Sequence, residues 1–263
     1  MIVIIIASCS LCFGIEGLLI DEGYDYRVVK HENFRIGEKL DYRVSWVVSG
    51  IKLLEVGYGE LDLKETLLMK NREVYHVIFK VKTAPFFDVL FKIRDVMDCY
   101  IDRAGVFSWG FSMDIREGKT HYTRETRFDQ RNHSGIHKSS LRNLEKKTKI
   151  LPFMQDFISA VYYIRVFDMQ KEKNITFNID NDGYAYEAAV TFIGQEKIKT
   201  SIGKIMADKL ILSWYKVGRK MQKEKESHLL WISADKNRVP LKVESFGDIG
   251  KFVTSLKEID NEK

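Results

Sequence analysis

The chain has 263 residues, 45% hydrophobic and 30% charged, so it can bury a substantial core and is not disordered. Its net charge of +5 is modest and its basic residues are spread along the chain, which argues against nucleic acid as a partner. Beyond the N-terminal segment only Cys99 remains, which excludes a disulfide framework and a cysteine-based metal cluster. Cys99 alternates with apolar neighbours and is predicted to be a small core residue.

The first residues resemble a secretory signal. Residues 1–7 form a continuous apolar run that is too short to span a bilayer. Small residues near Gly14 predict cleavage before Ile15, which would make residues 1–14 the signal. Alternatively, the four residues ending at Cys9 resemble a lipobox, and Cys9 would then carry a lipid. Both interpretations predict export to the periplasm or cell envelope, with membrane association only if Cys9 is lipidated. A buried N-terminal strand is the remaining interpretation.

Apolar and polar residues alternate through most of the chain. A period of two places one face of a strand in a core and the other in water. The predicted strands are 40–46, 51–64, 75–81, 93–102, 107–115, 120–130, 173–180, 184–193, 197–206, 209–216, 226–233, 238–246 and 250–258. Many short strands at about ten-residue spacing indicate a mainly β fold. We therefore expect residues 15–263 to form a single β-rich domain, a large curved antiparallel sheet that makes an open barrel or a sandwich.

One segment departs from this period and predicts a central helix. Asp156 is a suitable N-cap, and Phe157, Val161 and Ile164 fall on one apolar stripe. We expect a helix over 156–167 that divides the chain into two strand-rich halves. A shorter helix is predicted after Pro85, and the polar, basic stretch before the central helix is expected to form an exposed hairpin or loop.

Motifs that would carry chemistry are weak. Asn178–Gly183 resembles the start of a calcium loop, but the chelating twelfth position is Ala189, so a tight turn is the better interpretation. The spacing of His121, His133 and His137 matches no zinc motif, and these side chains are expected to be exposed. The sequence has no nucleophile elbow and no P-loop. It therefore predicts no catalytic residue, metal or cofactor, although it leaves open a site assembled from distant strands.

Four segments in order resemble a bacterial family known as domain of unknown function 3108. They are Phe34–Tyr42, Phe91–Asp102, Asp156–Arg165 and Leu230–Gly250. The resemblance covers about residues 34–258. It implies an exported or periplasmic bacterial protein without an established activity, and it supplies no catalytic residues. The strand-rich pattern is also similar to that of the periplasmic lipoprotein carriers, whose half-open barrel holds acyl chains.

The matched residues are interpreted mainly as architectural. Gly37 would open the first strand, Asp156 would cap the helix and Pro240 would sit near a strand edge. Alternatively, Asp95, Asp156 and Arg165 would form a buried ion pair that fixes the helix on the sheet. The full matched set is Gly37, Glu38, Tyr42, Asp95, Asp156, Ser159, Tyr162, Arg165, Trp231, Ser233, Asp235, Pro240 and Gly250.

Three functions follow as hypotheses. The first is a non-enzymatic binding or carrier module for an apolar or lipid-like ligand, in which a curved sheet leaves a cavity and the helix acts as a lid. The second is an envelope scaffold or assembly protein that binds another protein through an exposed apolar patch or sheet edge. The third is a hydrolase, which would gather ionisable residues with shifted pKa values in a cleft.

Overall fold

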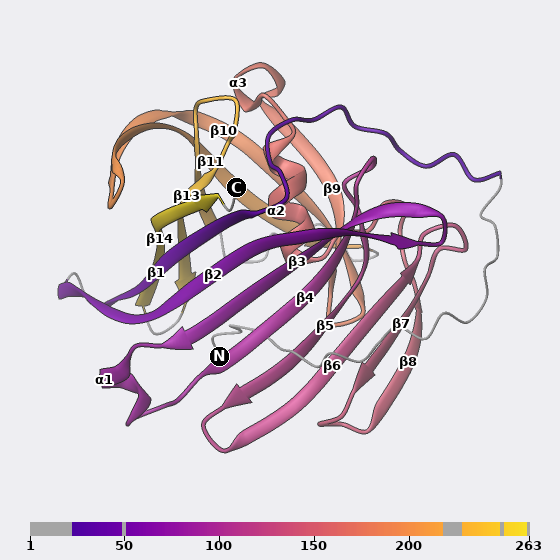
Figure 1. The fold of residues 1–263 in the computed structure, drawn as a ribbon, viewed down its shortest axis with the longest axis horizontal. Coiled ribbons are helices and arrows are strands. Elements are labelled where there is room, and N and C mark those ends of the chain that lie inside the picture. Colours follow the sequence, from indigo (N-terminus) through magenta and orange to yellow (C-terminus); the bar gives the residue numbers. More distant parts are fainter. Residues whose placement is uncertain (1–22, 49–50, 218–227, 248–249, 262–263) are drawn as a thin grey trace.

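A computed structural model describes residues 23–48, 51–217, 228–247 and 250–261 of the chain. Its strands join one antiparallel sheet of 14 strands in the order β8-β7-β6-β5-β4-β3-β2-β1-β14-β13-β12-β11-β10-β9. The predicted fold, a large curved antiparallel sheet, is confirmed, and the sheet is open because its two end strands are not paired with each other (Figure 1). The signal-like residues 1–14, and with them Cys9, lie outside the described residues.

The first half of the chain is a meander in which each strand pairs with the next. Its strands are β1 (Glu38–Val48), β2 (Ile51–Met69), β3 (Arg72–Thr83), β4 (Arg94–Asp102), β5 (Ser108–Glu117), β6 (Thr120–Asp129), β7 (Ser134–Ser139) and β8 (Leu144–Lys149). The polar stretch before the central helix thus forms the expected hairpin, β7–β8. Alternation holds within the strands: Leu40, Tyr42 and Val44 are buried, whereas Asp41 and Arg43 between them are only half-buried.

The second half is another meander. Its strands are β9 (Asn174–Asn181), β10 (Tyr184–Thr200), β11 (Gly203–Lys216), β12 (His228–Ser233), β13 (Pro240–Gly247) and β14 (Gly250–Asn261). The prediction of separate strands over 184–193 and 197–206 is wrong. A bulge between Phe192 and Gly194 lets one long strand continue across both segments, and the chain turns only after Thr200. The predicted turn at Asp182 and Gly183 is confirmed, with φ of 54° and 77°.

The two halves meet where β1 pairs with β14, from Glu38 opposite Asn261 to Val47 opposite Lys251. The first and last strands of the chain therefore lie side by side at the centre of the sheet, and the two strands nearest the middle of the sequence, β8 and β9, form its edges. The segment that connects these edges contains the central helix.

The helices are α1 (Pro85–Asp88), α2 (Phe157–Arg165) and α3 (Met169–Glu172). The two predicted helices are confirmed, and α3 was not predicted. The helix α2 lies within the curve of the sheet, against β4 and β9 (Figure 1). No helix in the described parts of the chain combines the length and apolar character needed to cross a bilayer.

The helix α2 is buried on nearly every side. Tyr162, Ile164 and Arg165 are each 1% exposed or less, while Phe157 is 40% exposed and Val161 is half-buried. The prediction that the stripe through Phe157 and Val161 forms the buried face of the helix is therefore wrong. A helix surrounded by a curled sheet needs apolar side chains all round, which removes the one-sided pattern on which the prediction relied.

Side chains of α2 and of both meanders fill the interior. The Tyr162 ring meets Phe34 edge-on with centroids 4.8 Å apart, and Tyr163 meets Phe177 at 5.6 Å. Cys99 lies in the same core, as predicted, and is fully buried. The sheet thus wraps around a packed helix.

The segment before α2 connects the edge strand β9 to the interior strand β5. Gln155 N–H donates to the Asn178 carbonyl at 2.8 Å, and the Gln155 carbonyl accepts from Asp180 N–H at 2.9 Å. On the other side, Ser108 N–H donates to the Met154 carbonyl at 3.1 Å. This segment therefore links β9 to the start of β5 through backbone hydrogen bonds.

The N-terminus of α2 generates a stability prediction. Asp156 Oδ1 accepts from the N–H groups of Ile158 and Ser159 at 2.7 and 2.9 Å, and Ser159 Oγ accepts from Asp156 N–H. We expect Asp156→Ala to lower the free energy of unfolding by about 1–2 kcal/mol, because these donors lose their acceptor. Asp156→Asn keeps the acceptor and should remain closer to wild type. Urea denaturation measures both, and equal losses would contradict a capping role.

Candidate functional site

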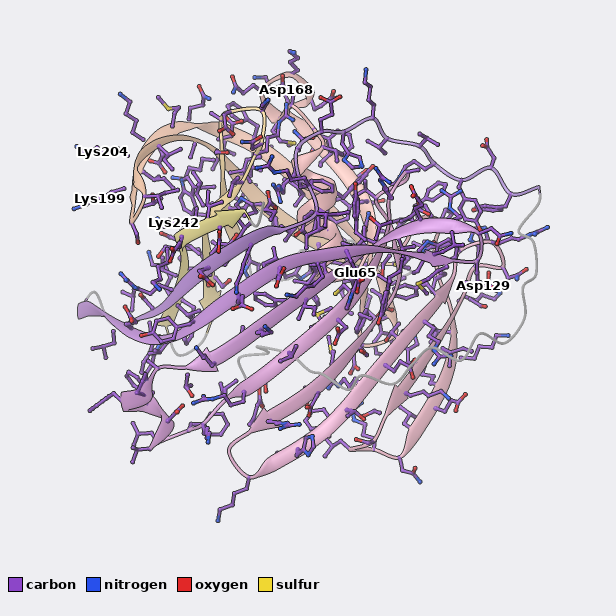
Figure 2. The ribbon with its side chains drawn as sticks, in the orientation of Figure 1. Glu65, Asp129, Asp168, Lys199, Lys204 and Lys242 are labelled. Carbon is purple, nitrogen blue, oxygen red and sulfur yellow. The ribbon has the colours of Figure 1, made fainter. Side chains whose placement is uncertain are left out.

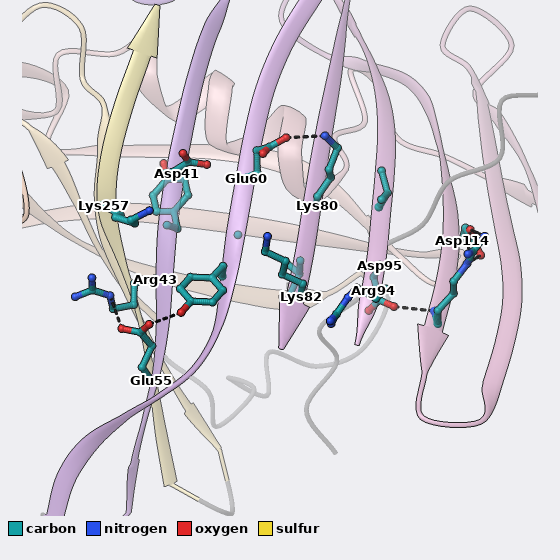
Figure 3. A pocket seen from close by; sticks show the side chains of 16 residues that line it. Asp41, Arg43, Glu55, Glu60, Lys80, Lys82, Arg94, Asp95, Asp114 and Lys257 are labelled. Atoms are coloured by element: carbon teal, nitrogen blue, oxygen red, sulfur yellow. Dashed lines mark hydrogen bonds and ion pairs between the residues drawn. The ribbon is translucent and has the colours of Figure 1, made fainter. Parts of the chain in front are cut away.

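A cavity of about 670 Å³ lies against β1 to β5 and near β14. We call it the outer groove, because most of its side chains alternate with those that face the core. Figure 3 shows how they extend across the strands. Its lining residues are Asp41, Tyr42, Arg43, Glu55, Tyr58, Gly59, Glu60, Lys80, Val81, Lys82, Arg94, Asp95, Val96, Asp114, Arg116 and Lys257.

Basic side chains form a row across this groove. Arg43 lies opposite Tyr58, Tyr58 opposite Lys82, and Lys82 opposite Arg94. Continuing the same register places Arg116 beside Arg94. Like charges directly opposite each other on neighbouring strands destabilise a sheet. This row therefore departs from what the sheet alone would favour.

Most of these cations have carboxylate partners. Arg43 pairs with Glu55 at 2.6 Å and Arg116 with Asp114 at 2.7 Å. Arg94 pairs with Asp88 of α1.

Lys82 has no acidic partner among the described residues. Its Nζ lies 5.9 Å from the centre of the Tyr58 ring, and its side chain is exposed. The groove therefore holds a central positive charge that is available to a ligand.

One buried carboxyl group lies beneath the row. Asp95 is 1% exposed, and its Oδ1 accepts from Arg116 N–H at 2.7 Å, while Oδ2 has no hydrogen-bond partner in the described structure. Desolvation is the main cause that raises the pKa of Asp95 to about 7. The hydrogen bond from Arg116 N–H opposes this rise, and the neighbouring Glu117 and Asp114 contribute to it.

A buried ion pair lies at the opposite rim of the sheet. Arg165, which is 0% exposed, donates to both carboxylate oxygens of Glu38 at 2.6 and 2.7 Å. It also donates to the carbonyls of Asn33 and Asn237 at 2.9 and 3.2 Å. This bidentate pair joins α2, the start of β1 and the β12–β13 turn.

The β12–β13 turn is itself organised by side chains. Ser233 Oγ donates to Asp235 at 2.6 Å and accepts from Val239 N–H at 2.9 Å. The hydroxyl of Tyr42 on β1 donates to the Pro240 carbonyl at 3.0 Å. These bonds hold the turn in the position that Arg165 requires.

The sequence model of a family described as "Protein of unknown function (DUF3108)" matches residues 41–257. The chain belongs to this family. No curated protein matches the chain.

Comparison with solved structures gives matches of low sequence identity. A β-barrel-like protein of domain of unknown function DUF1849 from Brucella abortus is 12% identical with a TM-score of 0.61, over 91% of this chain and 100% of that one. A candidate lipoprotein from Parabacteroides distasonis is 11% identical with a TM-score of 0.37, over 89% and 100%. A candidate exported protein with a YmcC-like fold from Bacteroides fragilis is 10% identical with a TM-score of 0.37, over 90% and 100%. The Brucella structure supports the fold alone.

The matched residues of this DUF3108 protein separate into groups. One group surrounds the buried ion pair, and it consists of Gly37, Glu38, Tyr42, Tyr162, Arg165, Ser233, Asp235 and Pro240. Asp156 and Ser159 form the cap of α2. The prediction that Arg165 pairs with Asp95 and Asp156 is wrong. Asp156 and Arg165 stand at opposite ends of α2, about 13 Å apart at 1.5 Å per residue, and Glu38 supplies the carboxylate instead.

The other matched residues lie apart from the ion pair. Asp95 lies under the outer groove. The ring of Trp231 has Lys209 and Lys242 over it at 5.2 and 4.1 Å from its centre. Gly250 has a φ of 121°, and a Cβ there would lie 2.5 Å from the Val47 carbonyl oxygen, so only glycine fits at this point of the β1–β14 pair.

The histidines do not gather into a site. His121 bonds to Asp114 on the outer face, whereas His137 contacts Thr126 and Thr148. The prediction of exposure is wrong for His137, whose side chain is 12% exposed, because the β9–β10 turn covers it. Among the described residues, no three His, Cys, Asp or Glu side chains converge as metal ligands would.

The groove cations were not candidates from the sequence. Arg43 and Arg94 occupy ordinary outward positions of predicted strands. Lys82 and Arg116 directly follow the predicted strands 75–81 and 107–115, and a basic side chain is normal at all four positions. The informative signal is that Arg43, Lys82, Arg94 and Arg116 align across strands, and that alignment depends on a register that the sequence does not specify.

The buried ion pair generates a second prediction. We expect Arg165→Met to lower the free energy of unfolding by about 3–5 kcal/mol, because Glu38 would remain buried without a partner. The double variant Arg165→Met with Glu38→Met should recover more than half of that loss. Chemical denaturation of the four proteins in this cycle measures the coupling, and equal losses in single and double variants would contradict it.

Asp95 generates a third prediction. Its folded pKa of about 7 exceeds its ordinary value of 3.8, so the folded protein holds the extra proton between these values. The stability contributed by this carboxyl is full below pH 4 and is lost as the pH rises through 7. Asp95→Asn keeps the acceptor for Arg116 N–H, and should stabilise the protein by about 4 kcal/mol at pH 8 with little change at pH 4. A difference that does not vary with pH would refute this account.

Proposed function

We propose that this DUF3108 protein is a non-enzymatic, exported binding protein that takes an anionic, lipid-like ligand into the outer groove. The observation that supports this proposal is the row of cations across β1 to β5. Lys82 and Arg94 face each other although like charges weaken a sheet, and a bound anion would relieve this repulsion. Departures from the rules of good folding are expected where function requires them.

The dimensions and lining of the groove fit such a ligand. Its volume of about 670 Å³ falls within the usual range of small-molecule sites, roughly 300–1,000 Å³. Lys82 offers a charge without a carboxylate partner in the described structure, and Tyr58 and Val96 offer apolar contact surface. The anionic group would pair with Lys82, and the apolar part of the ligand would lie along the neighbouring strands.

The packed interior favours a ligand on the outer face over one inside the sheet. A hollow carrier with α2 as its lid would leave room between helix and strands. Instead, Tyr162 and Ile164 of α2 are each 1% exposed within the core. An acyl chain could enter the described core only by displacing these side chains, whereas the outer groove is already formed.

The chemistry of the groove supports binding over hydrolysis. Its lining among the described residues includes no Ser, Thr, Cys or His, the side chains that commonly act as nucleophile or base. Asp95 has the raised pKa of a general acid, but it is 1% exposed and bonded to the backbone of Arg116. Export, which the apolar run of residues 1–7 predicts, would bring the protein to an environment that contains anionic amphiphiles.

Binding of dodecyl phosphate below its micelle concentration tests the proposal. We expect calorimetric binding by the full chain that weakens with salt, and weaker binding of the uncharged dodecyl maltoside. Lys82→Glu should weaken dodecyl phosphate binding roughly 10- to 100-fold, because a hydrogen bond to a charged group contributes about 1.5–3 kcal/mol.

The matched control is Lys204→Glu. Lys204 is an exposed lysine at the start of β11, four strands away from β1 in the sheet (Figure 2). The Lys204→Glu substitution introduces the same change of charge as Lys82→Glu and should leave dodecyl phosphate binding unchanged. Equal binding by wild type and Lys82→Glu would refute the groove as the ligand site.

A further inference from the structure

The connection between β3 and β4 exposes an apolar surface. We call residues 85–91, which contain α1, the apolar lobe. Phe86 is 78% exposed, Val89 89%, Leu90 73% and Phe91 51%. Isolated exposed apolar residues are ordinary, but a contiguous group marks an interaction site. In Figure 1 the lobe projects beyond the ends of β3 and β4.

Polar contacts at its base hold the lobe in shape. Thr83 Oγ1 and Arg94 both donate to the Asp88 carboxylate, with one Arg94 contact at 2.9 Å. Thr83 Oγ1 also accepts from Ile93 N–H at 3.0 Å. The pKa of Asp88 is lowered to about 2, chiefly by its hydrogen bond from Arg94. The only acidic residue of the lobe, Asp88, therefore bonds to the base of the lobe, and Arg94 neutralises its charge.

The neighbouring β5–β6 turn supports the lobe and adds charge. Gly118 N–H donates to the Lys92 carbonyl at 2.8 Å, and the Phe91 ring lies over Gly118, where an added Cβ would be 3.0 Å away. Lys92 directly follows the lobe, Lys119 directly follows Gly118, and both are exposed. A rigid apolar projection backed by lysines is the pattern of elements that lie in a membrane interface.

We propose that the apolar lobe docks this protein on an anionic membrane surface. Phe86, Val89 and Leu90 enter the interfacial layer, and Lys92 and Lys119 meet the negatively charged headgroups. The lobe borders the outer groove at Arg94, which lines the groove and holds Asp88. Docking therefore places the mouth of the groove near the membrane, although the docking itself does not depend on a groove ligand.

The charge distribution favours a membrane over a protein partner. Residues 82–94 and 116–119 carry five basic and two acidic side chains, and one of the two acids is Asp88. The lobe thus presents apolar side chains in front and positive charge behind, without an exposed carboxylate of its own. An anionic bilayer matches both features at once, because it offers hydrocarbon beneath a negative surface.

Vesicle flotation of the full chain tests the proposal. Wild type should float with vesicles of phosphatidylcholine and phosphatidylglycerol, and less with phosphatidylcholine alone. We expect the triple variant Phe86→Ser, Val89→Ser and Leu90→Ser to lose about tenfold or more in partitioning, since each side chain forfeits its apolar burial. Lys92→Glu with Lys119→Glu should remove the preference for phosphatidylglycerol.

The matched control replaces apolar side chains of similar exposure at the opposite rim, Leu68→Ser and Val28→Ser, which are 71% and 76% exposed in the wild type. It should float like wild type. A direct measurement uses Val89→Trp, whose fluorescence should be quenched by brominated lipid, whereas that of Leu68→Trp should not. Unchanged flotation of the serine variant, or absence of quenching at position 89, would overturn the proposal.

The outcomes separate docking from ligand binding. Loss of flotation in the lobe variant with retained dodecyl phosphate binding supports docking independently of the groove. Loss of dodecyl phosphate binding in Lys82→Glu with retained flotation supports ligand binding in the groove independently of docking. A third outcome would overturn the membrane proposal. If the wild type does not bind vesicles, and the lobe variant loses a protein partner that cross-links to the wild type, the lobe docks on a protein.

Discussion

The ion pair between Arg165 and Glu38 is the constraint on which the architecture depends. A guanidinium without solvent contact must have its donors satisfied, and here the carboxylate of Glu38 and the carbonyls of Asn33 and Asn237 accept them. These acceptors come from the N-terminal segment, the first residue of β1 and the β12–β13 turn. One side chain therefore fixes α2 against both halves of the sheet at the rim where they come together.

Placing the helix inside the sheet decides where ligands can bind. Fourteen strands provide a curved surface with room at its centre, and the bulky side chains of α2 occupy that room. The remaining sites are on the outer face and at the rims. The outer groove and the apolar lobe lie next to each other there, and Arg94 touches both. Both proposals thus concern one end of the molecule, the end opposite the buried ion pair.

Much of the fold follows from local pattern, and much of the site does not. Alternation such as that from Leu40 to Trp46 requires only neighbouring residues, so the strands, the Asp156 cap and the Asp182–Gly183 turn were predictable. The prediction of two strands over 184–206 was wrong because a bulge between Phe192 and Gly194 keeps one strand continuous, and a bulge leaves no clear mark in the alternation. The pairing of Arg165 with Glu38 spans 127 residues, and the cation row depends on register between strands. Neither is encoded in any short stretch of sequence.

The pairing of β1 with β14 has a consequence for how the molecule assembles. Glu38 and Asn261 become partners although nearly the whole chain separates them, so the middle of the sheet cannot be completed until the last strand is available. Contacts between residues so distant in sequence form slowly, because a long loop must close before they can be made. Until then the edge of β1 that later pairs with β14 has unpaired backbone donors and acceptors, which can pair with a strand of another chain. Newly made chains are therefore expected to be most prone to aggregation before β14 pairs with β1.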